Sequence, residues 1–492
     1  MSTTVVETQY GKVQGTRSGP AFVWKGIPFA QPPLGDLRFR APQAPSPWTG
    51  VRDATTFGLA SAQSGRMMQR LFSATPEPSD EDCLFLNIWS PGAGDKRRPV
   101  LFWIHGGAFT MGSSSTPWYD GTAFATNGDV VIVTINYRLG ALGFLNLADI
   151  DGKDKDLSSN CGLLDQVAAL EWVRDNIAAF GGDPYNITVF GESAGAMSIG
   201  TLLAMLMAKG LFQKAILQSG ASHTALDREI ASRIANKLID TLGIHKVTDL
   251  VDVPLEQLLA AQDKVSDSSG RLAFQPVVDG VTLSHQPIQA IADGSANGVS
   301  LLVGTNRDEM RLFTMMDPAQ ATPDMAILER LFGTKAKEVV ATYEAAQPEQ
   351  SSSDVWINFL TDRTFRIPAI RLAERQSARG TNVWMYRFDW PTPVFGGRLK
   401  ACHGLEISFV WNNLDKYGVN LLTGDAAARQ KVADAMHPAW IAFARSGNPN
   451  TSGLPQWPAY DTTHRATMLF NEECQVVNDP QSAERQLWEG VL

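Results

Sequence analysis

The residues with the clearest chemical potential form the sequence G-E-S-A-G at positions 191–195. A β-branched, apolar run at 187–190 precedes it and a run of small and apolar residues at 194–206 follows it, which predicts a strand, a tight turn and a buried helix. A G-x-S-x-G turn exposes its serine, because only glycine on either side avoids the neighbouring backbone. Ser193 is therefore the predicted nucleophile, and the N–H of Ala194 at the helix start is a predicted donor to a developing oxyanion.

A serine hydroxyl becomes an effective nucleophile when a base accepts its proton and a third group orients that base. Among seven histidines, His403 stands out because it lies in a loop beyond a predicted strand at 382–388, where catalytic groups collect in α/β sheets. The loop after a predicted strand at 300–304 supplies Asp308 and Glu309, and the residues alone leave the choice between these two acids open. The chain order serine, acid, histidine is that of the α/β-hydrolases.

A second loop is predicted to complete the site. The sequence H-G-G-A at 105–108 follows a predicted strand and matches the oxyanion loop that accompanies a nucleophile elbow. The N–H groups of Gly106 and Gly107 are predicted to face the substrate oxygen, while His105 braces the loop. His437 is interpreted as a structural residue at the start of a helix. The other histidines are predicted to have surface or packing roles: His223, His245, His285 and His464.

The elements that must position these residues alternate between strand and helix. Helices are predicted at 162–180, with amphipathic spacing, and at 227–242. Apolar runs typical of strands in a helix-covered sheet lie at 84–89, 100–104, 130–135, 214–218, 300–304 and 382–388. This alternation indicates an α/β protein with an open, mostly parallel sheet. No internal repeat or linker rich in Gly or Ser divides the chain, so a single domain spanning 1–492 with helical insertions is predicted.

Composition narrows the partners and the compartment. The net charge of −9 comes from 42 basic and 51 acidic residues without charge runs, which argues against nucleic acid or an anionic membrane as partner. Residues 1–7 lack the features of a signal peptide, and the apolar run at 199–208 is too short to span a bilayer. The four cysteines form neither a disulfide framework nor a zinc motif: Cys83, Cys161, Cys402 and Cys474. A cytoplasmic protein with reduced thiols, no metal and no cofactor is therefore expected.

Further blocks make the chain resemble the type-B carboxylesterases, the cholinesterase-like branch of the α/β-hydrolases. E-D-C-L-F-L-N-I at 81–88 is similar to one family signature, and F-G-G-D-P at 180–184 leads into the serine signature. Other similar blocks are N-Y-R at 136–138, G-L-L-D-Q at 162–166, Q-S-G-A at 218–221 and P-V-V-D-G at 276–280. The resemblance covers nearly the whole chain. It implies the α/β-hydrolase fold, a large twisted sheet flanked by helices, with insertions around the active-site cleft.

The resemblance also assigns residues. It implies that Glu309 is the acid and Asp308 a neighbour, that Gly106, Gly107 and Ala194 form the oxyanion hole, and that Ser219 is a supporting serine near the triad. Animal members pair the cysteine matching Cys83 with an upstream cysteine, but residues 54–80 contain none. The chain in this respect is similar to the bacterial p-nitrobenzyl esterases.

The substrate pocket is predicted to be apolar and roomy. Acetylcholinesterases carry a tryptophan that binds quaternary ammonium, and the corresponding segment around 67–72 has none. Their two acyl-pocket phenylalanines would correspond to Gly270 and Leu272, which argues against choline esters. Residues near the catalytic loops are predicted to line the cleft: Phe109, Met111, Trp118, Tyr119, Phe313, Met315 and Met316.

Together these features predict a cofactor-free serine carboxylesterase that hydrolyses uncharged, hydrophobic esters through an acyl-enzyme, with broad specificity. The expected partner is a small-molecule ester, and the expected state is a monomer or weak homo-oligomer. A carbamate or amide hydrolase using the same triad is one alternative. A non-catalytic, cholinesterase-like binding protein is another, and it is disfavoured because all triad positions are filled.

Overall fold

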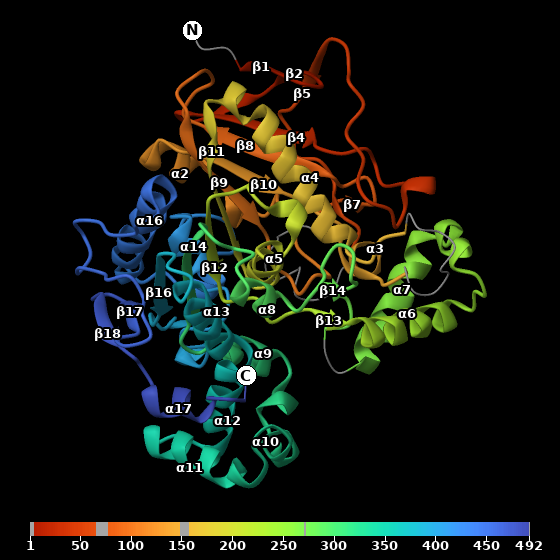
Figure 1. The fold of residues 1–492 in the computed structure, drawn as a ribbon. Helices are drawn as coiled ribbons and strands as arrows, with labels where there is room; N and C mark the ends of the chain where they lie inside the picture. The colour runs from red at the N-terminus through yellow and green to blue at the C-terminus, as the bar shows by residue number, and fades with distance from the viewer. Residues whose placement is uncertain (1–3, 65–76, 148–156, 270–271, 492) are drawn as a thin grey trace.

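An eleven-stranded sheet forms the centre of the computed structural model, which describes residues 4–64, 77–147, 157–269 and 272–491 (Figure 1). In sheet order the strands are β18 (Gln475–Asn478), β17 (Ala466–Phe470), β16 (Val383–Phe388), β15 (Ser300–Asn306), β12 (Lys214–Gln218), β11 (Gly182–Glu192), β9 (Arg98–Ile104), β10 (Val131–Ile135), β8 (Phe85–Ser90), β4 (Ala21–Pro28) and β3 (Thr16–Ser18). The strands from β17 to β10 are all parallel, and antiparallel strands flank them on both sides. The predicted mostly parallel α/β sheet is confirmed.

Helices cover both faces of this sheet, and side-chain alternation along each strand divides the core accordingly. In β9, Val100, Phe102 and Ile104 pack into one apolar cluster, while Leu101 and Trp103 pack into the other. The first face carries α4 (Cys161–Asn176), α5 (Ala194–Leu202) and α13 (Ile367–Ser377). The second carries α2 (Thr122–Gly128), α14 (Ile407–Val410) and α16 (Ala428–Ser446). Because both faces are buried, the central strands are apolar along their whole length.

Two helix predictions need correction. The predicted amphipathic helix at 162–180 is α4 followed by a 3₁₀ turn at Ile177–Phe180, and α4 is buried on most sides because it contacts the sheet, α5 and α3 (Gly140–Phe144). His437 lies within α16 and not at a helix start. Pro438 follows it inside the helix, and a proline at that position resembles the first turn of a helix when only the sequence is read.

Most of the remaining helices form two groups beside the sheet. One pair is α6 (Arg228–Leu242) and α7 (Leu255–Ser269), at the right of Figure 1; the second group, at the bottom, contains α9 (Met310–Met316), α10 (Met325–Phe332), α11 (Ala336–Ala346), α12 (Ser352–Thr361) and the C-terminal α17 (Ser482–Leu487). Several of these helices follow the carboxyl ends of strands, where α/β sheets place their ligand sites.

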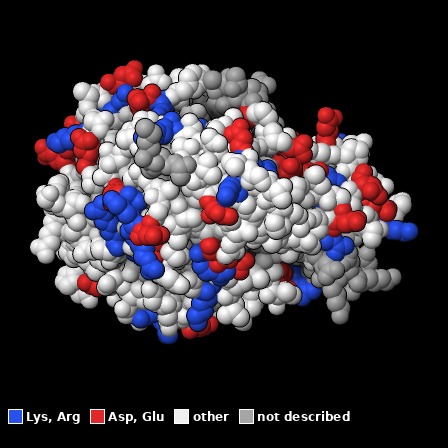
Figure 2. All heavy atoms as spheres, turned by 90° about the horizontal axis from the view of Figure 1, so that it is seen from above, with Lys and Arg blue, Asp and Glu red and all other residues white. Residues whose placement is uncertain are grey.

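The surface and the thiols add little further chemistry. On the face in Figure 2, acidic and basic side chains are interspersed with uncharged surface. The cysteines are free thiols: Cys83, Cys161 and Cys402 are buried and Cys474 is half-buried. In the part of the chain that the structure describes, no helix is both long and apolar enough to cross a membrane.

Candidate active site

Ser193 occupies the sharp turn between β11 and α5. Its backbone has φ 56° and ψ −124°, and its N–H donates to the Gln218 carbonyl oxygen at 2.9 Å. A Cβ added at Gly195 would lie 2.0 Å from the carbonyl oxygen of Ile104, and one at Gly191 would lie 2.6 Å from that oxygen. Ile104 ends the neighbouring strand β9, so close approach of that strand requires glycine on both sides of the serine.

His403 and Glu309 face each other across 94 residues of sequence. Nδ1 of His403 lies 2.6 Å from Oε2 of Glu309, which is fully buried. The other oxygen of Glu309 accepts the backbone N–H of Asn306 at 2.7 Å, which holds the carboxylate at the end of β15. Asp308 instead accepts the N–H of Ala401 at 3.4 Å. Of the two acids that the residues left open, Glu309 is the one in contact with His403.

A second carboxylate contacts the same imidazole and was not predicted from the sequence. Oε1 of Glu192, the residue immediately before Ser193, lies 3.1 Å from Nε2 of His403. Burial raises the pKa of Glu192. Burial would lower the pKa of His403, but the Glu192 and Glu309 carboxylates outweigh it and raise that pKa above the ordinary imidazole value. The only sequence signal for this contact was an acidic residue, Glu192, at the variable position before the serine in the G-x-S-x-G turn.

Glu406 forms a buried support beneath this pair and was also missed. Its carboxylate accepts hydrogen bonds from Gln218 Nε2 at 3.1 Å and from Asn306 Nδ2 at 2.6 Å. Asn306 Nδ2 also donates to the carbonyl oxygen of Cys402 at 2.7 Å. These contacts tie the loop that carries His403 to the ends of β12 and β15, so the imidazole is held by the sheet itself.

The glycine loop after β9 passes directly beside the serine. A Cβ at Gly106 would lie 3.1 Å from the Cβ of Ser193, and Gly107 has φ +110°. His105 is buried behind this loop, where its Nδ1 is 2.8 Å from the Gly106 carbonyl oxygen and its ring stacks on Tyr137 at 4.6 Å. Burial lowers the pKa of His105 to about 4, so its neutral ring supports the loop.

These groups open into one cavity of about 1270 Å³, whose wall includes Gly106, Gly107, Ser193, Ala194 and His403. Of the residues expected to line the pocket, those on the wall are Met111, Trp118, Tyr119, Leu272, Phe313 and Met316. The cavity is larger than many ligand pockets and has room for substrates of varied size.

Two pocket predictions were wrong and two lie outside the described residues. The side chain of Phe109 is fully buried and packs against Phe144, with ring centroids 5.1 Å apart. The loop has positive φ at Ala108 and at Phe109, 55° and 60°, and the Phe109 side chain lies in the core and not on the cavity wall. Met315 is an exposed surface residue and not part of the wall. Gly270 and the segment around 67–72 are outside the described part of the chain.

Several wall residues were not predicted. Phe365, together with Phe313, flanks the imidazole of His403, with ring centroids 4.8 and 5.0 Å away. His223, interpreted above as a surface or packing residue, lies on the cavity wall, as does Arg363. Both reach it through folding of distant segments, so no local pattern marked them.

Ser219, the supporting serine implied by the resemblance, directly follows Gln218. It is fully buried with φ 52°, and its N–H donates to the Gly304 carbonyl oxygen at 2.8 Å. Its backbone thus links the ends of β12 and β15 behind the elbow.

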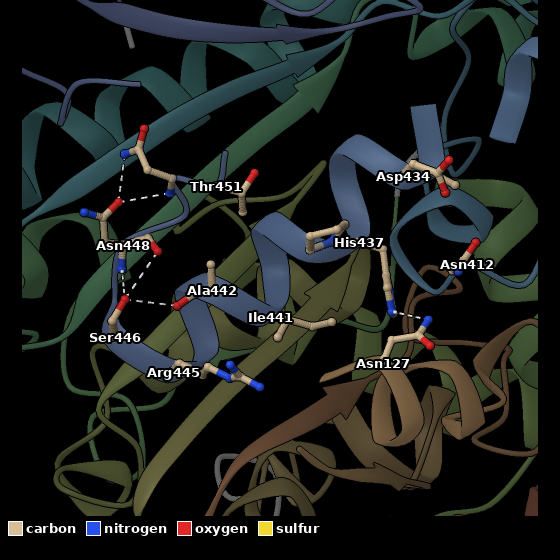
Figure 3. Close-up of a pocket in the computed structure, with 13 residues that line it drawn as sticks. Asn127, Asn412, Asp434, His437, Ile441, Ala442, Arg445, Ser446, Asn448 and Thr451 are labelled. Atoms are coloured by element: carbon tan, nitrogen blue, oxygen red, sulfur yellow. Dashed lines mark hydrogen bonds between the residues drawn. The ribbon is translucent and has the colours of Figure 1, made fainter. Parts of the chain in front are cut away.

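A second cavity, of about 770 Å³, lies along α16 (Figure 3). His437 borders it, but Nδ1 of this histidine is 2.8 Å from the Val410 carbonyl oxygen and Nε2 faces Asn127 Nδ2 at 3.5 Å. Ser446 Oγ donates to the Ala442 carbonyl oxygen at 3.1 Å, also within α16. Burial lowers the pKa of His437, and its contacts are those of a structural residue.

Comparison with known proteins places the whole chain in one family. The model of the carboxylesterase family matches residues 2–488. The para-nitrobenzyl esterase of Bacillus subtilis is 44% identical over 99% of this chain and 98% of the relative, and the phenmedipham hydrolase of Pseudarthrobacter oxydans is 36% identical over 95% of both. The crystal structure of carboxylesterase EST55 from Geobacillus stearothermophilus superposes with a TM-score of 0.90 at 45% identity, covering 99% of this chain and 100% of that one. The chain therefore belongs to the carboxylesterase family and has its α/β-hydrolase fold.

Proposed function

We propose that this protein is a serine carboxylesterase in which Ser193 is the nucleophile, His403 the general base and Glu309 the residue that orients it. Membership of the carboxylesterase family makes the chain a carboxylic-ester hydrolase. The observation that carries the residue assignment is the meeting of the Ser193 elbow, the glycine loop and the 2.6 Å His403–Glu309 contact at one cavity.

This assignment of roles corresponds to the following chemistry. Ser193 Oγ attacks the ester carbonyl carbon while His403 Nε2 takes the hydroxyl proton, and Glu309 stabilises the resulting imidazolium. The tetrahedral oxyanion accepts hydrogen bonds from the N–H groups of Gly106, Gly107 and Ala194. Collapse breaks the bond to the alcohol, which leaves with the proton from His403. Water, deprotonated by the same imidazole, then hydrolyses the acyl-enzyme and restores Ser193.

The proposed substrates are uncharged, hydrophobic carboxylic esters, with broad specificity. The support is the wall near the site, where Trp118, Leu272 and Phe313 present apolar surface and Met111 and Met316 add side chains that can repack. We further propose one domain over 1–492, a cytoplasmic location consistent with the free thiols, and a monomer or weak homo-oligomer.

The test is the Ser193→Ala variant, assayed with p-nitrophenyl butyrate. Loss of the nucleophile is expected to lower kcat by about 10⁴-fold or more while the thermal unfolding midpoint stays close to wild type. Ser446→Ala, a serine at the second cavity, is the matched control and keeps wild-type turnover. A Ser193→Ala enzyme with near wild-type kcat contradicts the assignment. Parallel assays with a carbamate and an anilide of the same acyl size decide between ester, carbamate and amide hydrolysis.

A further inference from the structure

An arginine that forms no ion pair with the residues that the structure describes lies on the wall of the catalytic cavity. Arg363 is half-buried there, and among the described residues its guanidinium has no hydrogen bond or ion pair. Nearby arginines differ: Arg311 is 2.5 Å from Asp354, and Arg366 is 2.9 Å from Asp362. A half-buried guanidinium on the cavity wall is available to form hydrogen bonds with an anion that enters the cavity.

A second arginine, Arg330, acts on the charge of Arg363. Burial, and then the charge of the exposed Arg330, lower the pKa of Arg363, and no carboxylate within the described ranges offsets them. The cavity wall also carries several acids: Glu77, Glu192, Asp227, Asp317 and Asp324. Arg363 is therefore a cationic side chain on a largely acidic wall. A negatively charged group in the cavity would be attracted by Arg363 and repelled by those acids that are ionised.

The local backbone directs this arginine into the cavity. Residues Asp362–Arg366 form a π-helical turn between α12 and α13, a feature that is frequent at functional sites. Three successive residues of the turn, 363–365, line the cavity, while the side chains of Asp362 and Arg366 bond to each other and to Tyr343 and the backbone of residues 480–481. Phe365 of the same turn contacts His403.

His223 fixes the position of this turn relative to the catalytic elements. His223 is exposed towards the cavity and is hydrogen-bonded to the backbone of Thr364. This contact links the loop after β12 to the turn that presents Arg363.

We propose that Arg363 forms an anion subsite within the catalytic cavity and that the enzyme hydrolyses, in addition to uncharged esters, esters carrying a carboxylate remote from the reacting ester group. This inference rests on the proposed function, because it adds a recognition element to the same site. A guanidinium matches a carboxylate with two parallel hydrogen bonds, and partial burial strengthens the interaction relative to water. The apolar wall would hold the segment between the ester and the carboxylate.

The test compares esters that differ only in the remote group. One pair varies the acyl side: p-nitrophenyl octanoate and mono-p-nitrophenyl suberate. The other varies the alcohol side: benzyl butyrate and 4-carboxybenzyl butyrate. Wild type, Arg363→Gln and Arg330→Gln are assayed with all four; Arg330→Gln removes the same charge from a neighbouring exposed position that is not on the cavity wall.

For at least one pair, Arg363→Gln is expected to lower kcat/KM for the carboxylate ester by about 10- to 100-fold, mainly through a higher KM, because a hydrogen-bonded charge pair is lost. The neutral esters should change by less than about twofold. The pair that responds identifies whether the acyl or the alcohol group reaches Arg363. Arg330→Gln should change no substrate by more than about twofold.

Equal effects of Arg363→Gln on carboxylate and neutral esters, or no effect on either, overturn the anion subsite. An equal loss of selectivity in Arg330→Gln overturns direct contact by Arg363. Wild-type inactivity towards the neutral esters contradicts the proposed function instead, so the two failures are distinguishable.

Discussion

Replacing Glu192 with glutamine should move the acid limb of the pH–rate profile. The proposed mechanism requires neutral His403, so activity falls as the pH drops through the pKa of this histidine. Glu192 and Glu309 raise that pKa. As the pH is lowered, wild-type activity should therefore begin to fall at a higher pH than it would with an ordinary imidazole. Glutamine has the shape of glutamate without its charge, so Glu192→Gln should lower the pKa of His403 and extend activity to lower pH.

The size of the shift follows from the contact distance. Two unit charges separated by 3.1 Å attract by about 5 kcal/mol at an effective dielectric constant of about 20, which is an upper bound here. Burial raises the pKa of Glu192, so this carboxylate is only partly ionised around neutral pH and exerts only part of that attraction. Since about 1.4 kcal/mol corresponds to one pKa unit, we expect the acid limb to move down by about 1–2 pH units.

The assay is kcat/KM for p-nitrophenyl butyrate between about pH 5 and about pH 10.5, because this ratio reports the titration of the free enzyme and the pKa of His403 is raised to about 9. Glu77→Gln is the control: Glu77 also lies on the cavity wall, but it accepts a hydrogen bond from Ser115. The acid limb of the Glu77→Gln variant should match that of the wild-type enzyme. An unchanged limb in a folded Glu192→Gln enzyme, or an upward shift, would refute the electrostatic coupling.

Two further substitutions test the pocket and the core. Leu272→Phe should narrow the cavity and lower the butyryl-to-acetyl ratio of kcat/KM by up to about 15-fold, since two buried methylenes contribute about 1.6 kcal/mol; an unchanged ratio for p-nitrophenyl esters contradicts a role for Leu272 in acyl selection. In the wild-type structure the buried Arg138 lies 2.7 Å from Asp165. Asp165→Asn removes this counter-ion and should reduce the free energy of unfolding, measured by urea denaturation, by about 3–5 kcal/mol. Glu229→Gln, which breaks the exposed pair with Arg233, should cost less than about 1 kcal/mol, and equal losses in the two variants would show that burial is not decisive.

Sequence alone determined the elements that local chemistry specifies. The strand runs were apolar because both faces of the sheet are covered, and their positions match β8, β9, β10, β12, β15 and β16. The elbow was recognisable because a close backbone approach permits only glycine at 191 and 195, a restriction that acts over a few residues. The loop that carries His403 could be selected because it follows β16, a strand of the same sheet as β11, which carries the serine turn.

Tertiary structure decided which side chains share an environment. Glu192 and Glu309 become partners of His403, and Glu406 reaches Gln218 across 188 residues, only when strand ends from distant segments meet. The closeness of Phe109 to the oxyanion glycines in the sequence predicted a pocket residue. In the structure its side chain packs against Phe144 in the core. No sequence pattern marked Arg363, because its exposure to the cavity depends on a π-helical turn. That no described residue forms an ion pair with it depends on all the elements around the cavity. Short motifs fix backbone geometry, but burial and charge pairing depend on long-range contacts, which a sequence pattern does not encode locally.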